Sequence, residues 1–111
     1  MKLLIDDKRN FLDVDIIART ALAGIAVLKT IYIDELFLDH DLGEVETICL
    51  NMVDDIESTG YGVLLWLEMP MNIKRRPKTI ILVTDNPAGR LRMELALRSI
   101  GYKEKAGQWK L

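Results

Sequence analysis

The chain is poor in cysteine, proline and aromatic residues, and each shortage narrows what it can be. Of its 111 residues, one is a cysteine (Cys49), three are prolines, and 6% are aromatic. A single cysteine excludes an intrachain disulfide framework and a cysteine-rich zinc site, and it fits a reducing compartment. No apolar run is long enough to span a membrane, and the run near Met1 is too short for a signal peptide. We therefore expect a cytoplasmic protein.

Neither sign of charge dominates the composition. The chain has 15 Lys and Arg against 17 Asp and Glu, a net charge of −2, and 50% hydrophobic residues. These values predict one globular domain over residues 1–111. The slightly negative charge argues against general nucleic-acid binding, which leaves a basic footprint. A small phosphorylated ligand stays compatible, because one arginine and a helix N-terminus can hold a phosphate.

Two apolar runs end in pairs of carboxylates. Asp6 and Asp7 follow the run Leu3–Ile5, and Asp39 and Asp41 flank the only histidine after the run 36–38. Carboxyl ends of parallel strands meet at one edge of a sheet, where α/β proteins bind ligands. Four carboxylates there would form an oxygen-only site for Mg²⁺ or Mn²⁺. The alternative is that acids follow strands because loops are polar.

Strand and helix patterns alternate along the chain, which predicts a mostly parallel sheet sandwiched by helices. Thr20 and the pair Asn86-Pro87 are typical helix starts. Apolar residues at three- and four-residue steps over Val45–Ile56 indicate an additional helix, inserted at about 44–58. The sequence predicts strands at 3–5, 14–19, 35–38, 79–83 and 102–106, and helices at 21–29, 45–56, 61–69 and 87–100.

Three motifs support a family resemblance. They are Leu-Asp-His-Asp-Leu-Gly at 38–43, Thr-Gly-Tyr at 59–61, and Asn-Pro-Ala-Gly-Arg at 86–90. With the acidic pair after the first strand and a Thr after the fourth, the chain resembles receiver domains of response regulators. It more closely resembles small stand-alone receiver-like proteins of bacteria and phages, which are thought to process cyclic phosphates in RNA repair. The resemblance implies a three-layer, flavodoxin-like fold, and location in the host cytoplasm if a phage encodes the chain.

The resemblance also implies roles for individual residues. Asp6 and Asp7 would hold Mg²⁺, Asp39 would match the phosphoacceptor position, and Asp41 could add a carboxylate to the metal. Thr84 would match the hydroxyl that contacts the phosphoryl group.

Residue chemistry adds three further candidates. His40 could be a general acid or base beside the metal, together with Asp39, or it could only stabilise a turn. Asn86 and Arg90 lie at a helix start, where N–H groups and the helix dipole attract a phosphate. The alternative is helix capping by Asn86 and a surface Arg90 paired with Glu94.

The chain departs from the receiver pattern at both ends of the sheet. Only about eight residues separate Asp6 from Val14, which is too few for the usual helical crossover. We therefore expect the second strand to pair antiparallel with the first. Lys103 and Lys105 stand where receivers have a Lys-Pro pair after the last strand.

Two functions follow from these observations. The first is a receiver-like domain with an acidic metal site that binds, and in a catalytic version processes, a small phosphorylated group of the cyclic-phosphate type. The alternative is a non-enzymatic interaction module on a degenerate receiver scaffold, docking a protein such as a host factor through the inserted helix. Nothing in the sequence indicates a membrane partner.

Overall fold

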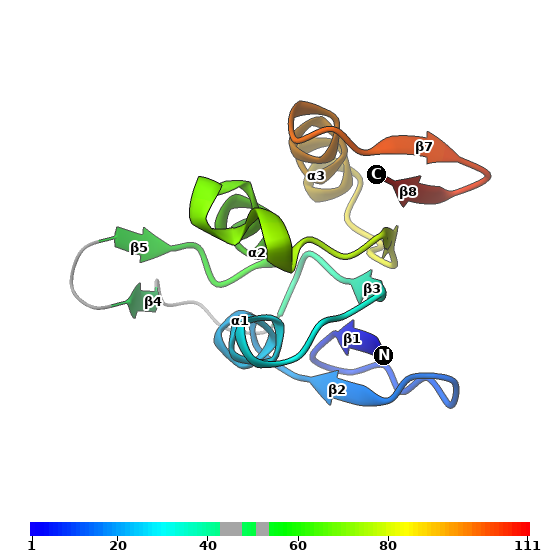
Figure 1. Ribbon diagram of the computed structural model, residues 1–111. Helices are drawn as coiled ribbons and strands as arrows, with labels where there is room; N and C mark the ends of the chain where they lie inside the picture. The colour runs from blue at the N-terminus through cyan, green and yellow to red at the C-terminus, as the bar shows by residue number, and fades with distance from the viewer. Residues whose placement is uncertain (43–47, 51–53) are drawn as a thin grey trace.

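The computed structural model describes residues 1–42, 48–50 and 54–111. Figure 1 shows a central sheet with helices packed beside it. The sheet contains β1 (Lys2–Ile5), β2 (Ile16–Ala18), β3 (Glu35–Leu38), β6 (Thr79–Leu82), β7 (Lys103–Lys105) and β8 (Gln108–Lys110). The other elements are α1 (Ala21–Thr30), the short strands β4 (Ile48–Leu50) and β5 (Asp54–Ile56), α2 (Gly60–Glu68), the 3-10 helix η1 (Pro70–Arg75) and α3 (Pro87–Ser99).

The sheet is parallel except at one edge. Its strand order is β2-β1-β3-β6-β8-β7, and β1 pairs parallel with both β2 and β3. Strand β3 pairs parallel with β6, whereas β8 and β7 are antiparallel. The receiver-like α/β class, the altered first crossover and an antiparallel edge strand are therefore confirmed.

The expected antiparallel pairing of the second strand with the first is wrong, because a loop without a helix makes the parallel return. The loop over residues 6–15 only has to run back along a four-residue strand, roughly 13 Å at about 3.3 Å per residue. Backbone hydrogen bonds fix both of its ends, from Asp6 N to Ala18 O (3.0 Å) and from Asp15 N to Lys2 O (3.0 Å). The guanidinium of Arg19 holds the middle, donating to the carbonyls of Asp6 (3.2 Å) and Arg9 (2.7 Å).

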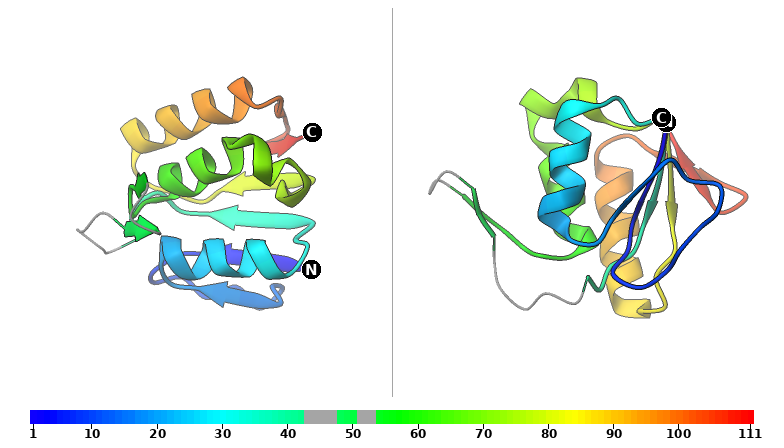
Figure 2. Two further views of the ribbon diagram at one scale, coloured as in Figure 1. Left: turned by 60° about the vertical axis from the view of Figure 1, so that its left-hand side comes forward. Right: turned by 90° about the horizontal axis from the view of Figure 1, so that it is seen from below.

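All three described α-helices lie on one face of the sheet. The left view of Figure 2 shows α1, α2 and α3 side by side in front of the strands, and the right view shows them on one side of the sheet. Their buried residues form one hydrophobic core with every second residue of the strands: Leu3, Ile5, Leu36, Leu38, Ile80, Leu82 and Trp109. Helix and sheet thus make two layers instead of the expected three. The reason is that β2→β3 and β3→β6 connect parallel strands and cross in the same direction, so right-handed connections place α1 and α2 on the same side.

Helix starts follow the predicted caps. The side chains of Thr20, Thr59 and Asn86 accept hydrogen bonds from the N–H of Ala23, Gly62 and Gly89, respectively. The apolar pattern of the last helix predicts that Leu91, Leu95, Leu97 and Ile100 face inward. This prediction is partly wrong, because Leu91 and Leu95 are 56% and 57% exposed. The buried residues of the helix are Gly89, Met93, Ala96 and Leu97, and of these only Leu97 belongs to the predicted face. No described helix has the length and apolar character needed to cross a membrane.

The inserted helix expected over Val45–Ile56 is not present where the chain is described. Strands β4 and β5 pair antiparallel there, with Ile48 opposite Ile56. Residues 43–47 and 51–53 of the prediction lie outside the described residues. Isoleucine favours strands as well as apolar helix faces, so three- and four-residue spacing over a short run did not separate the two structures.

Candidate acidic site at the carboxyl edge of the sheet

Three carboxylates meet where β1 and β3 end. Asp6, Asp7 and Asp39 each place one oxygen within 4.8 Å of the others. Parallel pairing causes this, since Ile5 and Leu38 are register partners and the next residues emerge side by side. Asp6 and Asp39 are buried, with 1% and 6% of their surface exposed, whereas Asp7 is half-buried.

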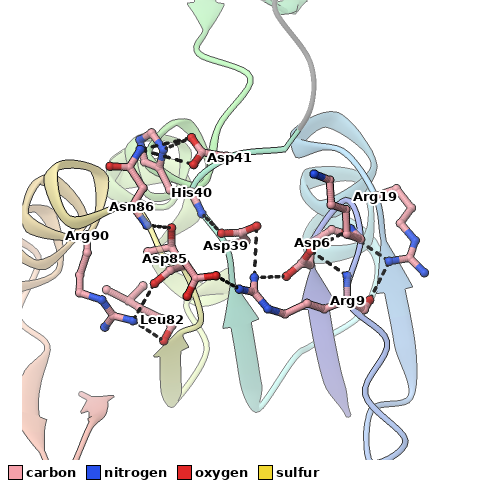
Figure 3. A network of polar contacts seen from close by, with 12 residues as sticks. Asp6, Arg9, Arg19, Asp39, His40, Asp41, Leu82, Asp85, Asn86 and Arg90 are labelled. Atoms are coloured by element: carbon pink, nitrogen blue, oxygen red, sulfur yellow. Dashed lines mark hydrogen bonds and ion pairs between the residues drawn. The ribbon is translucent and has the colours of Figure 1, made fainter.

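A cation of the chain itself lies among these acids. Arg9 Nη1 is 2.8 Å from Asp6 Oδ2 and 3.5 Å from Asp39 Oδ2, and its Nη2 is 2.7 Å from Asp85 Oδ2 (Figure 3). The loop after β1 is tied to the same carboxylate, because the N–H groups of Lys8 and Arg9 both donate to Asp6 Oδ1. One guanidinium therefore links the ends of β1, β3 and β6.

The pKa values of the two buried carboxylates, Asp6 and Asp39, are shifted in opposite directions. Burial pushes the pKa of Asp6 up, but hydrogen bonds from Arg9 and Lys8 outweigh it and leave that pKa below its ordinary value. Burial and then the charge of Asp6 raise the pKa of Asp39, against hydrogen bonds from the His40 N–H and the Thr84 hydroxyl and the attraction of Arg9. The surroundings therefore favour the anion of Asp6 and disfavour that of Asp39.

Asp41 lines the same cavity but stands apart from the three grouped carboxylates. Its Oδ1 is 2.9 Å from His40 Nδ1, and Asn86 Nδ2 donates to both of its oxygens at 3.4 Å. The hydrogen bond from His40 lowers the pKa of Asp41, and the Asn86 amide adds to the shift. The side chain is 66% exposed, so water reaches this carboxylate.

His40 is buried behind Asp41. Its imidazole packs on the start of α3, where a Cβ placed on Gly89 would lie 2.5 Å from His40 Cγ. Among the described residues its Nε2 has no hydrogen-bond partner. The ring does not line the cavity, so it reaches the site through the carboxylate of Asp41 and not directly.

The predicted phosphate-binding residues divide into two groups. Thr84 is buried at the end of β6, where its hydroxyl contacts Asp39 and accepts the N–H of Asn86. Asn86 caps α3. Arg90 turns away, because its Nη2 donates to the carbonyls of Leu82 and Thr84 at 3.2 Å each.

These residues surround an open cavity of about 310 Å³. Its lining consists of Asp6, Asp7, Lys8, Arg9, Asp39, Asp41 and Asp85. Carboxylate oxygens with a guanidinium among them suit a hard divalent cation with an anionic ligand beside it.

Comparison with known proteins assigns the chain to a family. The family model described as the cyclic-phosphate processing receiver domain matches residues 1–99. The chain belongs to this family. No curated protein and no solved structure matches it.

In this receiver domain the sequence located the acids and missed their counter-ion. Asp6, Asp7 and Asp39 were found because each follows an apolar strand. Arg9 looked like an ordinary residue of a polar loop, and Arg90 looked like the anion-binding arginine. The one available signal was the short spacing of Arg9 from Asp6, which places a cation within reach of the strand end.

Proposed function

We propose that this receiver domain binds a divalent cation, Mg²⁺ or Mn²⁺, and beside it a small phosphorylated group of the cyclic-phosphate type. The observation that carries the proposal is the group of three carboxylate oxygens within 4.8 Å, facing a cavity that also presents Arg9.

The donor set fits the cation. Asp6, Asp7 and Asp39 offer oxygen only, which is the ligand type that Mg²⁺ and Mn²⁺ prefer. Asp39 is destabilised as a buried anion next to Asp6, so a bound cation would relieve the repulsion between them. Asp41 would serve a different role, since His40 and Asn86 already engage its oxygens.

Arg9 takes the anion-binding role that the sequence suggested for Arg90. Its guanidinium borders the cavity and is 33% exposed, so it can exchange one of its carboxylate partners for a phosphate oxygen. A planar guanidinium binds two oxygens of a phosphate side by side. Thr84 would offer its hydroxyl to the same ligand from the end of β6.

Opening a cyclic phosphate needs a water attack on phosphorus, cleavage of one phosphorus–oxygen bond and a proton for the leaving oxygen. When bound, the cation would supply positive charge at a phosphoryl oxygen. Asp41 is an exposed carboxylate of the cavity that Arg9 does not engage, and it would accept the proton of the attacking water and pass it to the leaving oxygen. His40 would keep Asp41 in place through its Nδ1.

Metal titration tests the first half of the proposal. Amide NMR shifts are followed while Mg²⁺ or Mn²⁺ is added to the wild type, to Asp39→Asn and to Asp34→Asn. Asp34 is a matched control, because it lies at the opposite end of β3 and pairs with the amino terminus. Saturable shifts at Asp6, Asp7 and Asp39 that Asp39→Asn removes would support the site. Equal responses in all three proteins would contradict it.

A cyclic nucleotide tests the second half. We expect phosphorus NMR to show a 2′,3′-cyclic nucleotide binding only with the metal present, and more weakly to Arg9→Gln than to Arg90→Gln. Turnover to a monoester that Asp41→Asn abolishes, with binding retained, would support catalysis. Binding without turnover would mean that the protein binds cyclic phosphates without hydrolysing them. Binding that does not need the metal would contradict the proposal.

A further inference from the structure

The net charge of −2 is the sum of a negatively charged first part and a positively charged second part of the chain. Residues 1–70 contain five Lys and Arg and 14 Asp and Glu, a net charge of −9. Residues 71–111 contain ten Lys and Arg and three Asp and Glu, a net charge of +7. Such asymmetry is a recognised signal of a polyanion partner. The carboxyl-terminal part includes β6, α3, β8 and β7.

Three lysines of the edge strands β7 and β8 lie on one face of the sheet. Lys103 and Lys110 are register partners, and Lys110 is also the partner of Thr79. Cross-strand partners point to the same face, as do residues two apart, so Lys105 joins them. The three lysines are exposed, and within the described chain none of them has an ion-pair partner.

This lysine face is the one that the helices leave open. Trp109 alternates with Lys110 along β8 and is 2% exposed beneath α3, with the Arg98 guanidinium 5.0 Å from its ring centre. The lysines therefore point away from α3. In the end-on view of Figure 2, the helices lie on one side of the strands and none of them covers the other.

Apolar side chains continue the open face toward the middle of the sheet. Phe37 and Ile81 are register partners on β3 and β6, and both are half-buried. Phe11, from the loop over residues 6–15, meets Phe37 edge to face at 5.4 Å. The loop thus covers the β1 side of this face, where Leu4 is fully buried, and leaves the side of β6, β8 and β7 accessible.

We propose that this open face, formed by Phe37, Thr79, Ile81, Lys103, Lys105 and Lys110, binds single-stranded nucleic acid. The lysines along one border of this face and the half-buried ring of Phe37 nearer its middle offer both elements of such binding. Cations track the phosphates, and bases stack on exposed apolar and aromatic side chains. Glu35, two residues before Phe37 on β3 and the register partner of Thr79, marks where the basic part of this face ends. The proposal is independent of the metal site, which lies at the carboxyl edge of the parallel strands.

Fluorescence anisotropy with an internally labelled oligouridine of about 12 nucleotides tests the proposal, and hydroxyl ends keep terminal phosphates away from the acidic site. In about 50 mM salt, Lys103→Gln/Lys110→Gln should weaken binding about tenfold or more. Each lysine that is removed leaves one phosphate with its counterions, so the free energy of their release is lost. The matched control Lys29→Gln/Arg92→Gln removes the same charge from the helical side and should change affinity less than about twofold. The logarithm of the wild-type association constant should fall against the logarithm of salt concentration with a slope of about −2.

Phe37→Leu separates stacking from charge. It keeps an apolar side chain on the face, so it should fold and yet bind about fivefold or more weakly. Thermal unfolding of each variant checks that the fold is retained. Absence of binding, equal losses in the two charge variants, or displacement of the oligonucleotide by an equally tight acidic peptide would overturn the proposal.

Discussion

The carboxyl edge of the parallel strands and the β7–β8 hairpin use charge and glycine in opposite ways. At the carboxyl edge, acids are buried in contact with Arg9, and Gly60 and Gly89 leave room for Asp39 and His40. In the hairpin region the charges are exposed lysines. Gly101 and Gly107 have empty space around them, and positive φ values of 102° and 81°. One region is constrained by close packing and the other by backbone conformation, so they should respond differently to mutation.

Adding one methyl group should give the largest contrast. A Cβ on Gly60 would lie 1.9 Å from the carbonyl oxygen of Asp39, which is backbone and cannot rotate away. We expect Gly60→Ala to lower the free energy of unfolding by more than about 3 kcal/mol, measured by urea denaturation. The matched variant Gly107→Ala should lose only about 1 kcal/mol, the cost of a left-handed conformation. Equal losses would show that packing does not distinguish the regions.

The hairpin also depends on one buried hydrogen bond. The Tyr102 hydroxyl donates to the carbonyl of Pro77 at 2.5 Å, and burial raises the pKa of this phenol. Tyr102→Phe leaves the carbonyl unpaired and should cost about 1–2 kcal/mol of unfolding free energy. Tyr32→Phe is the control, since Tyr32 is 41% exposed. A neutral Tyr102→Phe would mean that water replaces the phenol.

Removing the internal cation should destabilise the acidic site by a smaller, salt-dependent amount. Without its guanidinium, Asp6 and Asp39 repel each other, so Arg9→Gln should lose about 1 kcal/mol in low salt without metal. Added Mg²⁺ should restore thermal stability to this variant more than to the wild type. An Arg9→Gln protein that Mg²⁺ leaves unchanged would contradict the idea that Arg9 and the cation neutralise the same carboxylates.

The smallest effect should come from Asp39 and should depend on pH. Its raised pKa means that ionised Asp39 costs stability, and this cost appears as pH rises from about 3.9, the ordinary Asp value, through the raised pKa. In metal-free buffer Asp39→Asn should be more stable than the wild type at neutral pH. The gain should be less than about 1 kcal/mol, because hydrogen bonds from His40 and Thr84 and the charge of Arg9 offset part of the cost of burying the anion. The difference should close as the pH falls. The pKa of Asp6 is lowered, so ionised Asp6 adds stability at pH values above the ordinary Asp pKa. Both proteins contain Asp6, so this contribution cancels in the comparison.

Local signals predicted much of the fold. Strand β3 has the predicted bounds, and the caps Thr20 and Asn86 begin their helices as expected. The helix predicted over Val45–Ile56 was wrong, because the apolar pattern was compatible with both a helix and strands. Only the pairing between β4 and β5 decided between them. The prediction that Leu91 and Leu95 face the core was wrong for another reason. A helix is oriented by the shape of what it packs on, and the buried face of α3 is formed by Gly89, Met93, Ala96 and Leu97.

The sequence by itself determined where the acids stand, because a carboxylate directly after a buried strand has to emerge at the sheet edge. The register of β1 against β3 then brought Asp6 and Asp39 together. Tertiary structure alone decided the rest: the parallel return of β2, the place of Arg9 among the acids, the turning of Arg90 to backbone carbonyls, and the open face of the sheet. Each of these depends on which distant residues a flexible side chain or loop meets, and the interactions that decide it span residues far apart in the chain.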